Sequence, residues 1–296
     1  MPASGVKRFL MPAFFVSSLP AALLLCGAAL CVNPAQPFRT LNDGDTGTRG
    51  DAPAGNTIAT RFPPPAGFRR VPAAAGSFGE YLRQLPLRPE GAAVHYFDGR
   101  RKPKNVHAAV VNIDVGSRDL QQCADAVMRL RAEWLYARGR KSEISFRLTD
   151  GRPASYAEWM KGRRIRVRGN NSSWYDGAAP GDSYASFRQY LDMVFTYAGT
   201  LSLAKELRPQ AVSAIAIGDV FIRGGSPGHA VIVADVVEND RGERRFLLAQ
   251  SYMPAQEIHI LKNESSADGS AWYSNRLSGW LETPEWNFRA GELKTW

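Results

Sequence analysis

The chain has 296 residues and a formal net charge of +9, and 44% of its residues are hydrophobic. This length and apolar content are enough for a packed core, so an intrinsically disordered protein is excluded. A charge of this sign attracts anionic partners, among which nucleic acid is expected only for a chain that stays in the cytoplasm.

Residues 1–32 have the layout of a targeting segment. Lys7 and Arg8 precede a nearly uncharged apolar run from Phe9 to Val32, as in the n-region and h-region of a secretory signal peptide. Small residues at 27–29 offer a cleavage site, and the same run is long enough to stay uncleaved as an N-terminal membrane anchor. Either alternative predicts an exported chain, located in the periplasm or associated with the envelope.

Export changes the expected partner of the basic side chains. The partner is then a cell-wall or other envelope component and not nucleic acid. The membrane would be contacted only through residues 1–32, if they stay uncleaved. We interpret most of the basic side chains as a solvated face, and they gather in three clusters: Arg69–Arg70, Arg100–Lys104 and Arg163–Arg168.

The segment 33–62 is predicted to be a flexible tether, because it is rich in Pro, Gly, Ala, Thr and Asp and shows no apolar period. Residues 63–296 are predicted to form a single α+β domain. Once a signal peptide is removed, Cys123 is the one cysteine left of three, so we expect no internal disulfide.

The first half of the predicted domain alternates helices and strands. A Ser-x-x-Glu capping pattern begins a helix over 77–87, which Pro86 ends. The clearest helix covers 119–139, where apolar residues recur every three or four positions until Gly139 stops it. Strands are predicted over 107–115, 143–151 and 162–170.

The second half begins with a helical region over 183–207, in which Gly199 is a candidate break. Four strands follow in close succession, over 217–222, 224–236, 246–252 and 257–261. The predicted fold class is therefore α+β, with a mostly antiparallel sheet and packed helices.

The stretch GGSPGHAVIVADV, residues 224–236, places a histidine at the start of a strand behind a Gly/Pro loop. A core strand has no need of an imidazole there, so we expect His229 to line an open pocket. The polar amide of Gln250 on the next strand is expected on the same face, where it would hold the imidazole in one tautomer. Strict alternation predicts four side chains on that face of the first strand: His229, Val231, Val233 and Asp235.

This region resembles the papain-like hydrolases of the cell-wall peptidase type. In those proteins a Gly-Asp strand and a short loop precede a strand that opens with His, and here Gly218–Phe221 precedes Gly228–Val233 with matching spacing. The resemblance implies a papain-like core and a cysteine nucleophile at the start of an upstream helix, with His229 as base and Gln250 as the orienting residue. The implied reaction is hydrolysis of an amide bond in a cell-wall peptide.

Two places compete for the role of nucleophile. Cys123 lies upstream of His229, but the predicted helix places it about one turn inside and on the apolar stripe, which favours a buried structural cysteine. If the later helix restarts after Gly199, Thr200 and Ser202 occupy the nucleophile position without a thiol. The chain would then be a non-catalytic module on a degenerate papain-like fold, binding a wall fragment or a partner protein.

The other histidines do not predict a metal site. His107 also opens a predicted strand, but no short ligand spacing joins it to His229. His259 alternates with Ile258 and Ile260, so we expect it to be exposed. No cofactor is expected.

Several long blocks of the chain are distinctive, among them SFGEYLRQLPL, GDVFIRGGSPGHAVIVADV and FLLAQSYMPAQEIHIL. Through these blocks, residues 63–296 as a whole resemble an uncharacterised bacterial family, domain of unknown function 4846. The resemblance implies an exported bacterial envelope protein and assigns no reaction.

Overall fold

The computed structural model describes residues 56–296. The predicted signal peptide or anchor and most of the predicted tether lie outside these residues. The fold begins before residue 63, because Ile58–Arg61 form the short helix α1 and the Ile58 side chain is fully buried. The backbone N–H of Ile58 donates to the Leu85 carbonyl at 3.2 Å, which ties this segment to the rest of the fold.

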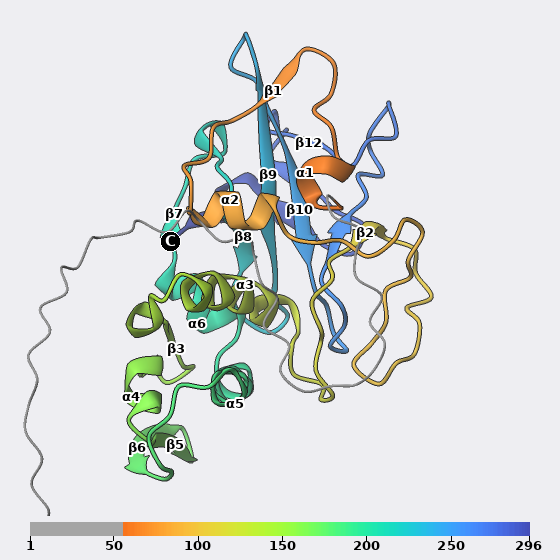
Figure 1. Ribbon diagram of the computed structural model, residues 1–296. Coiled ribbons are helices and arrows are strands. Elements are labelled where there is room, and N and C mark those ends of the chain that lie inside the picture. The colour runs from red at the N-terminus through yellow and green to blue at the C-terminus, as the bar shows by residue number, and fades with distance from the viewer. Residues whose placement is uncertain (1–55) are drawn as a thin grey trace, which may run out of the picture. The chain divides into compact units, whose positions relative to one another are not determined.

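A nine-stranded antiparallel sheet forms the centre of the fold (Figure 1). The predicted α+β class is therefore confirmed, and strands from both halves of the chain enter the same sheet. In order across the sheet, the strands are β2 (His107–Val110), β11 (His259–Leu261), β10 (Arg244–Gln250), β9 (His229–Asn239), β8 (Val220–Arg223), β15 (Leu293–Thr295) and β7 (Arg208–Pro209), with β1 (Phe68–Arg70) paired to β9 and β12 (Tyr273–Ser274) paired to β10.

Helices cover one face of this sheet, and Figure 1 shows α2 and α3 in front of β9. The predicted helix over 183–207 is divided at Gly199, as its sequence suggested. Besides α1, the helices are α2 (Phe78–Arg83), α3 (Cys123–Ala137), α4 (Tyr156–Met160), α5 (Tyr184–Tyr197) and α6 (Thr200–Glu206), with short 3₁₀ helices at Lys141–Glu143, Val212–Ala214 and Ala290–Glu292.

Three separate hairpins complete the fold. One of them, β13–β14, packs Phe288 against the sheet face that lies opposite the helices, together with Val231 and Val233 of β9. The hairpins are β3 (Ser145–Arg147) with β4 (Pro153–Ser155), β5 (Arg163–Arg168) with β6 (Asn171–Asp176), and β13 (Trp280–Glu282) with β14 (Asn287–Arg289).

A β-bulge in β9 changes which side chains share a face. Asp235 pairs with Leu247, but the next pair is Val233 with Leu248, so Ala234 is the extra residue. Before the bulge His229 lies on the face packed against β14, and after it Asp235 lies on the face packed against the helices. The prediction that these two residues share a face is therefore wrong, because one extra residue inverts the alternation.

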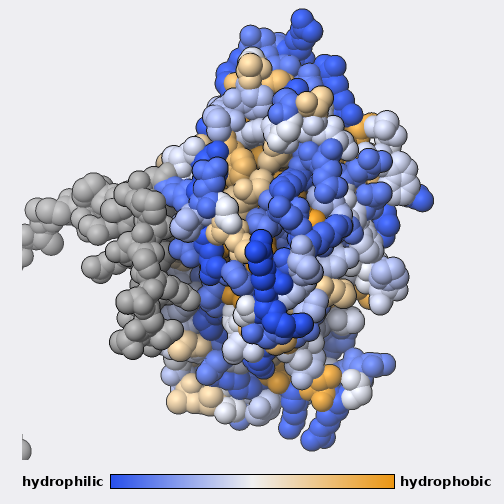
Figure 2. Space-filling view, turned by 90° about the vertical axis from the view of Figure 1, so that its right-hand side faces the viewer, coloured by the Kyte–Doolittle hydropathy of each residue, from blue (hydrophilic) through white to orange (hydrophobic). Residues whose placement is uncertain are grey.

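Polar residues dominate the face of the molecule drawn in Figure 2, with apolar residues visible between them. Most members of the predicted basic clusters are exposed or half-buried, as a solvated face requires. Lys102 is an exception, because it is buried and paired with Glu285. Arg70 is also only partly exposed and pairs with Asp235.

Within the described range 56–296, no helix has the length and apolar character needed to cross a bilayer. The same range contains no group of three His, Cys, Asp or Glu side chains arranged to hold a metal ion.

Candidate functional site

His229 and Gln250 lie in direct contact where β9 begins and β10 ends. The Nε2 atom of His229 lies 2.8 Å from Oε1 of Gln250. The bulge in β9 makes this contact possible. It shifts the pairing of β9 with β10 by one residue, and after this shift Gln250 and His229 lie on the same face of the sheet. A continuous ladder without the extra residue would have turned His229 to the helix side of the sheet, away from Gln250.

The His229 ring is buried, so the prediction of an open pocket at this residue is wrong. Only 1% of the residue is exposed. Three aromatic rings surround the imidazole, with centroid separations of 4.7 Å to Tyr252, 5.6 Å to Trp286 and 5.8 Å to Phe288. The polar site therefore lies beneath an aromatic cover supplied by the segment after β10 and by the β13–β14 hairpin.

The orientation of the Gln250 amide follows from its other contacts. Its Nε2 group donates to Oε2 of Glu285 at 2.7 Å and lies 3.3 Å from Nε2 of His259. The Nδ1 atom of His259 lies 2.8 Å from the Glu257 carbonyl, so Nδ1 carries the proton and Nε2 accepts. Both amide hydrogens are thereby engaged, and Oε1 faces His229 as an acceptor.

This orientation fixes the tautomer of His229. Because Oε1 of Gln250 can only accept, the imidazole must donate from Nε2. The Nδ1 atom is then the unprotonated nitrogen, and it makes no hydrogen bond within residues 56–296. A neutral imidazole held in this way presents one basic nitrogen for proton transfer.

A buried ion pair supports the amide from behind. Lys102 Nζ donates to Glu285 Oε2 at 2.7 Å and to Gln256 Oε1 at 2.8 Å. The same Lys102 ammonium lies 5.5 Å from the centre of the Tyr252 ring. Burial lowers the pKa of Lys102, while its contact with Glu285 opposes that shift. The ion pair, the amide and the imidazole form one hydrogen-bonded chain from Lys102 to His229.

Cys123 is the first residue of α3, not a residue one turn inside it. The predicted helix began at Asp119, but the polar groups before Cys123 are used elsewhere. Asp119 Oδ1 accepts the backbone N–H of Ala255 at 2.6 Å, and the Gln121 carbonyl accepts the Ser251 hydroxyl at 2.8 Å. The segment before α3 is thus bonded to the loop that follows β10, and α3 starts later than its apolar pattern suggests.

The start of α3 brings Cys123 next to the histidine strand. The backbone amide of Ala230, the residue after His229, lies close enough to the thiol to act on its pKa. The pKa of Tyr252 is raised by burial first, then by Glu285 and by Cys123, and the Tyr252 ring contacts His229. The structure therefore gathers Cys123, His229 and Gln250 in one region.

In this buried arrangement the thiol and the imidazole are both neutral. Burial, with the charge of Asp125, raises the pKa of Cys123 to about 11, although the amides of Ala124 and Ala230 oppose the shift. Burial also lowers the pKa of His229 to about 4, and Lys102 acts in the same direction. A reactive thiolate–imidazolium pair would require the site to become more polar than it is here.

The alternative nucleophiles make structural hydrogen bonds. Thr200 is the first residue of α6, and its hydroxyl donates to the Gly225 carbonyl at 3.1 Å. The Ser202 hydroxyl donates to the Gly199 carbonyl and accepts the Gly199 N–H, both at 3.1 Å. Neither hydroxyl has a hydrogen bond to His229 within the described chain.

The Gly/Pro loop before His229 is packed too closely to accept a side chain at Gly228. A Cβ atom there would lie 2.5 Å from both the Gly225 carbonyl oxygen and the Thr200 hydroxyl, and 2.7 Å from the Arg223 carbonyl oxygen. We expect Gly228→Ala to lower the free energy of unfolding by about 1–3 kcal/mol. Chemical denaturation measures this, and Gly181→Ala is the matched control because its Cβ would meet nothing within 4 Å. Equal effects of the two substitutions would contradict the close packing.

The structure places the other two strand histidines, His107 and His259, beside each other. His107 and His259 have ring centroids 6.1 Å apart. His259 is completely buried, so the prediction that it is exposed is wrong. The Nε2 atom of His107 lies 3.0 Å from the Ala92 carbonyl.

Sequence reasoning missed the residues that surround the His229–Gln250 pair. Glu285 and Lys102 lie 183 positions apart in sequence, and no local pattern links them. Nothing in the sequence marks Trp286 beyond its being aromatic. Buried charge within the cluster Arg100–Lys104 could be recognised only from the fold.

A family model described as "Domain of unknown function (4846)" matches residues 58–295. A comparison with curated proteins gave no match. A comparison with solved structures gave no match either. The matched range covers almost all of the described fold, including Cys123, His229 and Gln250, and the chain therefore belongs to the family of domain of unknown function 4846.

Proposed function

We propose that this chain is an exported bacterial envelope protein that hydrolyses an amide bond of a cell-wall peptide, with a papain-like arrangement of Cys123, His229 and Gln250. The observation that carries the proposal is the fixed tautomer of His229. Its Nε2–H is held by Gln250 at 2.8 Å, and its basic Nδ1 has no hydrogen-bond partner in the described chain. The apolar run after Lys7 and Arg8 supports export.

In this proposal Nδ1 of His229 removes the proton from the Cys123 thiol, and Sγ attacks the carbonyl carbon of the substrate amide. The carbon–nitrogen bond breaks, and the same proton passes from His229 to the departing amine. Water then hydrolyses the thioester, with His229 accepting and returning a proton. The amide of Gln250 keeps the imidazole in the tautomer that each step needs.

The N-terminus of α3 adds positive potential at the nucleophile. Cys123 is the first residue of this 15-residue helix, where the partial positive charge of a helix favours a thiolate. In the structure burial outweighs this effect, since the pKa of Cys123 is raised to about 11. The proposal therefore includes movement of the aromatic cover, Tyr252 and Trp286, to admit water and substrate.

The burial of His229 favours a second candidate, a non-catalytic binding module on the same architecture. The rings of Tyr252, Trp286 and Phe288 cover the imidazole, and the thiol is neutral. A module needs no proton transfer. It would bind a wall fragment or a partner protein at the surface over these rings, close to Thr200 and Ser202 of α6.

Alkylation and hydrolysis distinguish the two candidates. We expect iodoacetamide to modify Cys123 in the folded protein, as measured by mass spectrometry of the peptide that contains it. We expect the protein to release new amino groups from purified cell-wall peptide, and Cys123→Ala or His229→Ala to reduce this rate at least about 1000-fold. Gln250→Ala should reduce the rate of amine release about 100-fold, because the imidazole loses its fixed tautomer.

Ser202→Ala serves as the control, since the Ser202 hydroxyl bonds only to the Gly199 backbone. We expect it to retain the parental rate. If Cys123 stays unmodified until denaturation and the parent releases no amine, the hydrolase proposal is refuted. Binding of wall fragments that is lost in His229→Ala would then support the module.

A further inference from the structure

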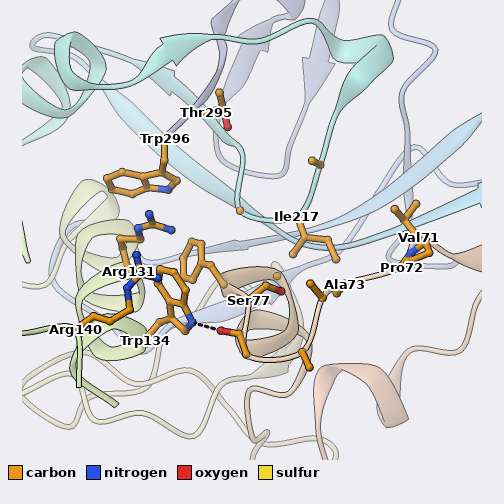
Figure 3. A pocket seen from close by; sticks show the side chains of 17 residues that line it. Val71, Pro72, Ala73, Ser77, Arg131, Trp134, Arg140, Ile217, Thr295 and Trp296 are labelled. Atoms are coloured by element: carbon orange, nitrogen blue, oxygen red, sulfur yellow. Dashed lines mark hydrogen bonds between the residues drawn. The ribbon is translucent and has the colours of Figure 1, made fainter. Parts of the chain in front are cut away.

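A second site lies on the helix-covered side of the sheet, away from Cys123 and His229. A pocket of about 600 Å³ opens between the segment leading into α2, the C-terminal part of α3 and the residues that end β15. Figure 3 shows Arg131, Arg140, Trp134 and Trp296 at one end of it. Val71, Pro72, Ala73 and Ile217 form the other, apolar end.

The guanidinium of Arg131 is sandwiched between aromatic rings. Its Cζ atom lies 4.5 Å from the ring centre of Trp134, 5.1 Å from that of Trp296 and 5.0 Å from that of Phe78. Figure 3 shows Trp296 and Trp134 on opposite sides of this group. Because the rings cover its two faces, Arg131 can offer hydrogen bonds only from the edge of its plane.

That edge has no protein acceptor. Arg131 makes no hydrogen bond or ion pair with any residue of the described fold, although it is half-buried. The Nε1–H group of Trp296 is also buried without a partner there. Trp134 differs, because its Nε1–H donates to the Gly76 carbonyl at 3.0 Å. Unmet donors beside a cavity indicate a missing acceptor.

The charge balance at this end of the pocket is positive. Glu143 is engaged by Arg140 through two contacts of 2.6 Å, so it neutralises that residue. Arg131 has no such counterpart. Burial and the nearby charge of Arg140 lower the pKa of Arg131 to about 10, with Glu143 opposing them, and Arg131 therefore remains charged near neutral pH.

We infer that this pocket binds a small anion with an apolar body, whose carboxylate or phosphate accepts from the edge of Arg131 and from Trp296. A planar, forked guanidinium matches both head groups in a two-point contact. The apolar body would extend over Val71 and Ile217. The inference is independent of the proposed hydrolase, because neither Cys123 nor His229 lines this pocket.

Titration monitored by tryptophan fluorescence tests the inference on the full chain, since Trp134 and Trp296 line the pocket. The probes are hexanoate and hexyl phosphate, which distinguish the two head groups, with neutral hexanamide and body-free acetate as comparisons. We expect one of the two hexyl anions to bind at least about 10-fold more tightly than hexanamide and acetate. Arg131→Gln should weaken the binding of that anion at least about 10-fold, and Arg131→Lys should weaken its binding less.

Arg166→Gln is the matched control. Arg166 also lies over an aromatic ring, 5.4 Å from the centre of Tyr175, but outside the pocket. It should leave the affinity unchanged, and the thermal midpoints of all variants report whether they fold. Binding of hexanamide as tight as that of the anions overturns the inference. So does an affinity that Arg131→Gln leaves unchanged, or a lack of binding by both hexyl anions at about 10 mM.

Discussion

Asp235→Asn is expected to lower the free energy of unfolding by about 3–5 kcal/mol, which is the usual cost of removing one partner from a buried ion pair. Asp235 is completely buried, and its two oxygens accept from Arg70 Nε at 2.9 Å and Arg83 Nε at 2.8 Å. The side chain of Arg83 is only 11% exposed. Asparagine would keep the size of Asp235 but leave two cations without their counter-charge.

Asp240→Asn provides the control on the same hairpin. The Asp240 side chain is 87% exposed and pairs with Arg69, which is 69% exposed, so its loss should change stability by less than about 1 kcal/mol. Urea denaturation of both variants and the parent at neutral pH measures the difference. Equal losses of stability for the two variants would show that burial does not determine how much the ion pairs of Asp235 with Arg70 and Arg83 contribute to the free energy of unfolding.

The ion pairs of Asp235 also show which part of the fold could not be predicted from the sequence. Largely apolar runs correctly indicated strands in β8, β9, β10 and β11, because these strands are buried on both faces. These runs could not locate the bulge at Ala234, which depends on how β9 fits β10. Asp235 consequently pairs with Arg70, 165 positions earlier, a partner that no local pattern identifies.

The candidate site was likewise predictable from the sequence only in part. The contact between His229 and Gln250 followed from neighbouring strands and a short turn, and their bond of 2.8 Å agrees with it. The position of Cys123 did not follow, because Asp119 and Gln121 bond to the distant loop after β10 instead of adding a helical turn. Local propensity cannot anticipate contacts that only the folded chain creates.

Stability at mildly acidic pH is expected to depend on His229 and His259. Burial lowers the pKa of His229 to about 4 and that of His259 to about 3, against an ordinary value near 6.5. Because both folded-state values are depressed, the stabilisation is complete above pH 6.5 and is lost as the pH falls toward them. Between pH 6.5 and 4.5 the two groups together should remove on the order of 4 kcal/mol.

Asp125 acts in the opposite direction. Burial raises its pKa to about 8, so its contribution to stability increases as the pH falls from 8 toward the ordinary value of 3.8. These three groups together should therefore remove on the order of 2 kcal/mol of stability from pH 6.5 to 4.5, as measured by urea denaturation of the parent and of variants at each position. His259→Gln should flatten the slope by up to about 1.4 kcal/mol per pH unit, and Asp125→Asn should steepen it.

A slope that His259→Gln and His229→Gln both leave intact would mean that these imidazoles are not held neutral by burial. The hydrogen-bonded chain from Lys102 through Gln250 would then not fix the tautomer on which the proposed proton transfer depends, since a protonated His229 has no free basic nitrogen.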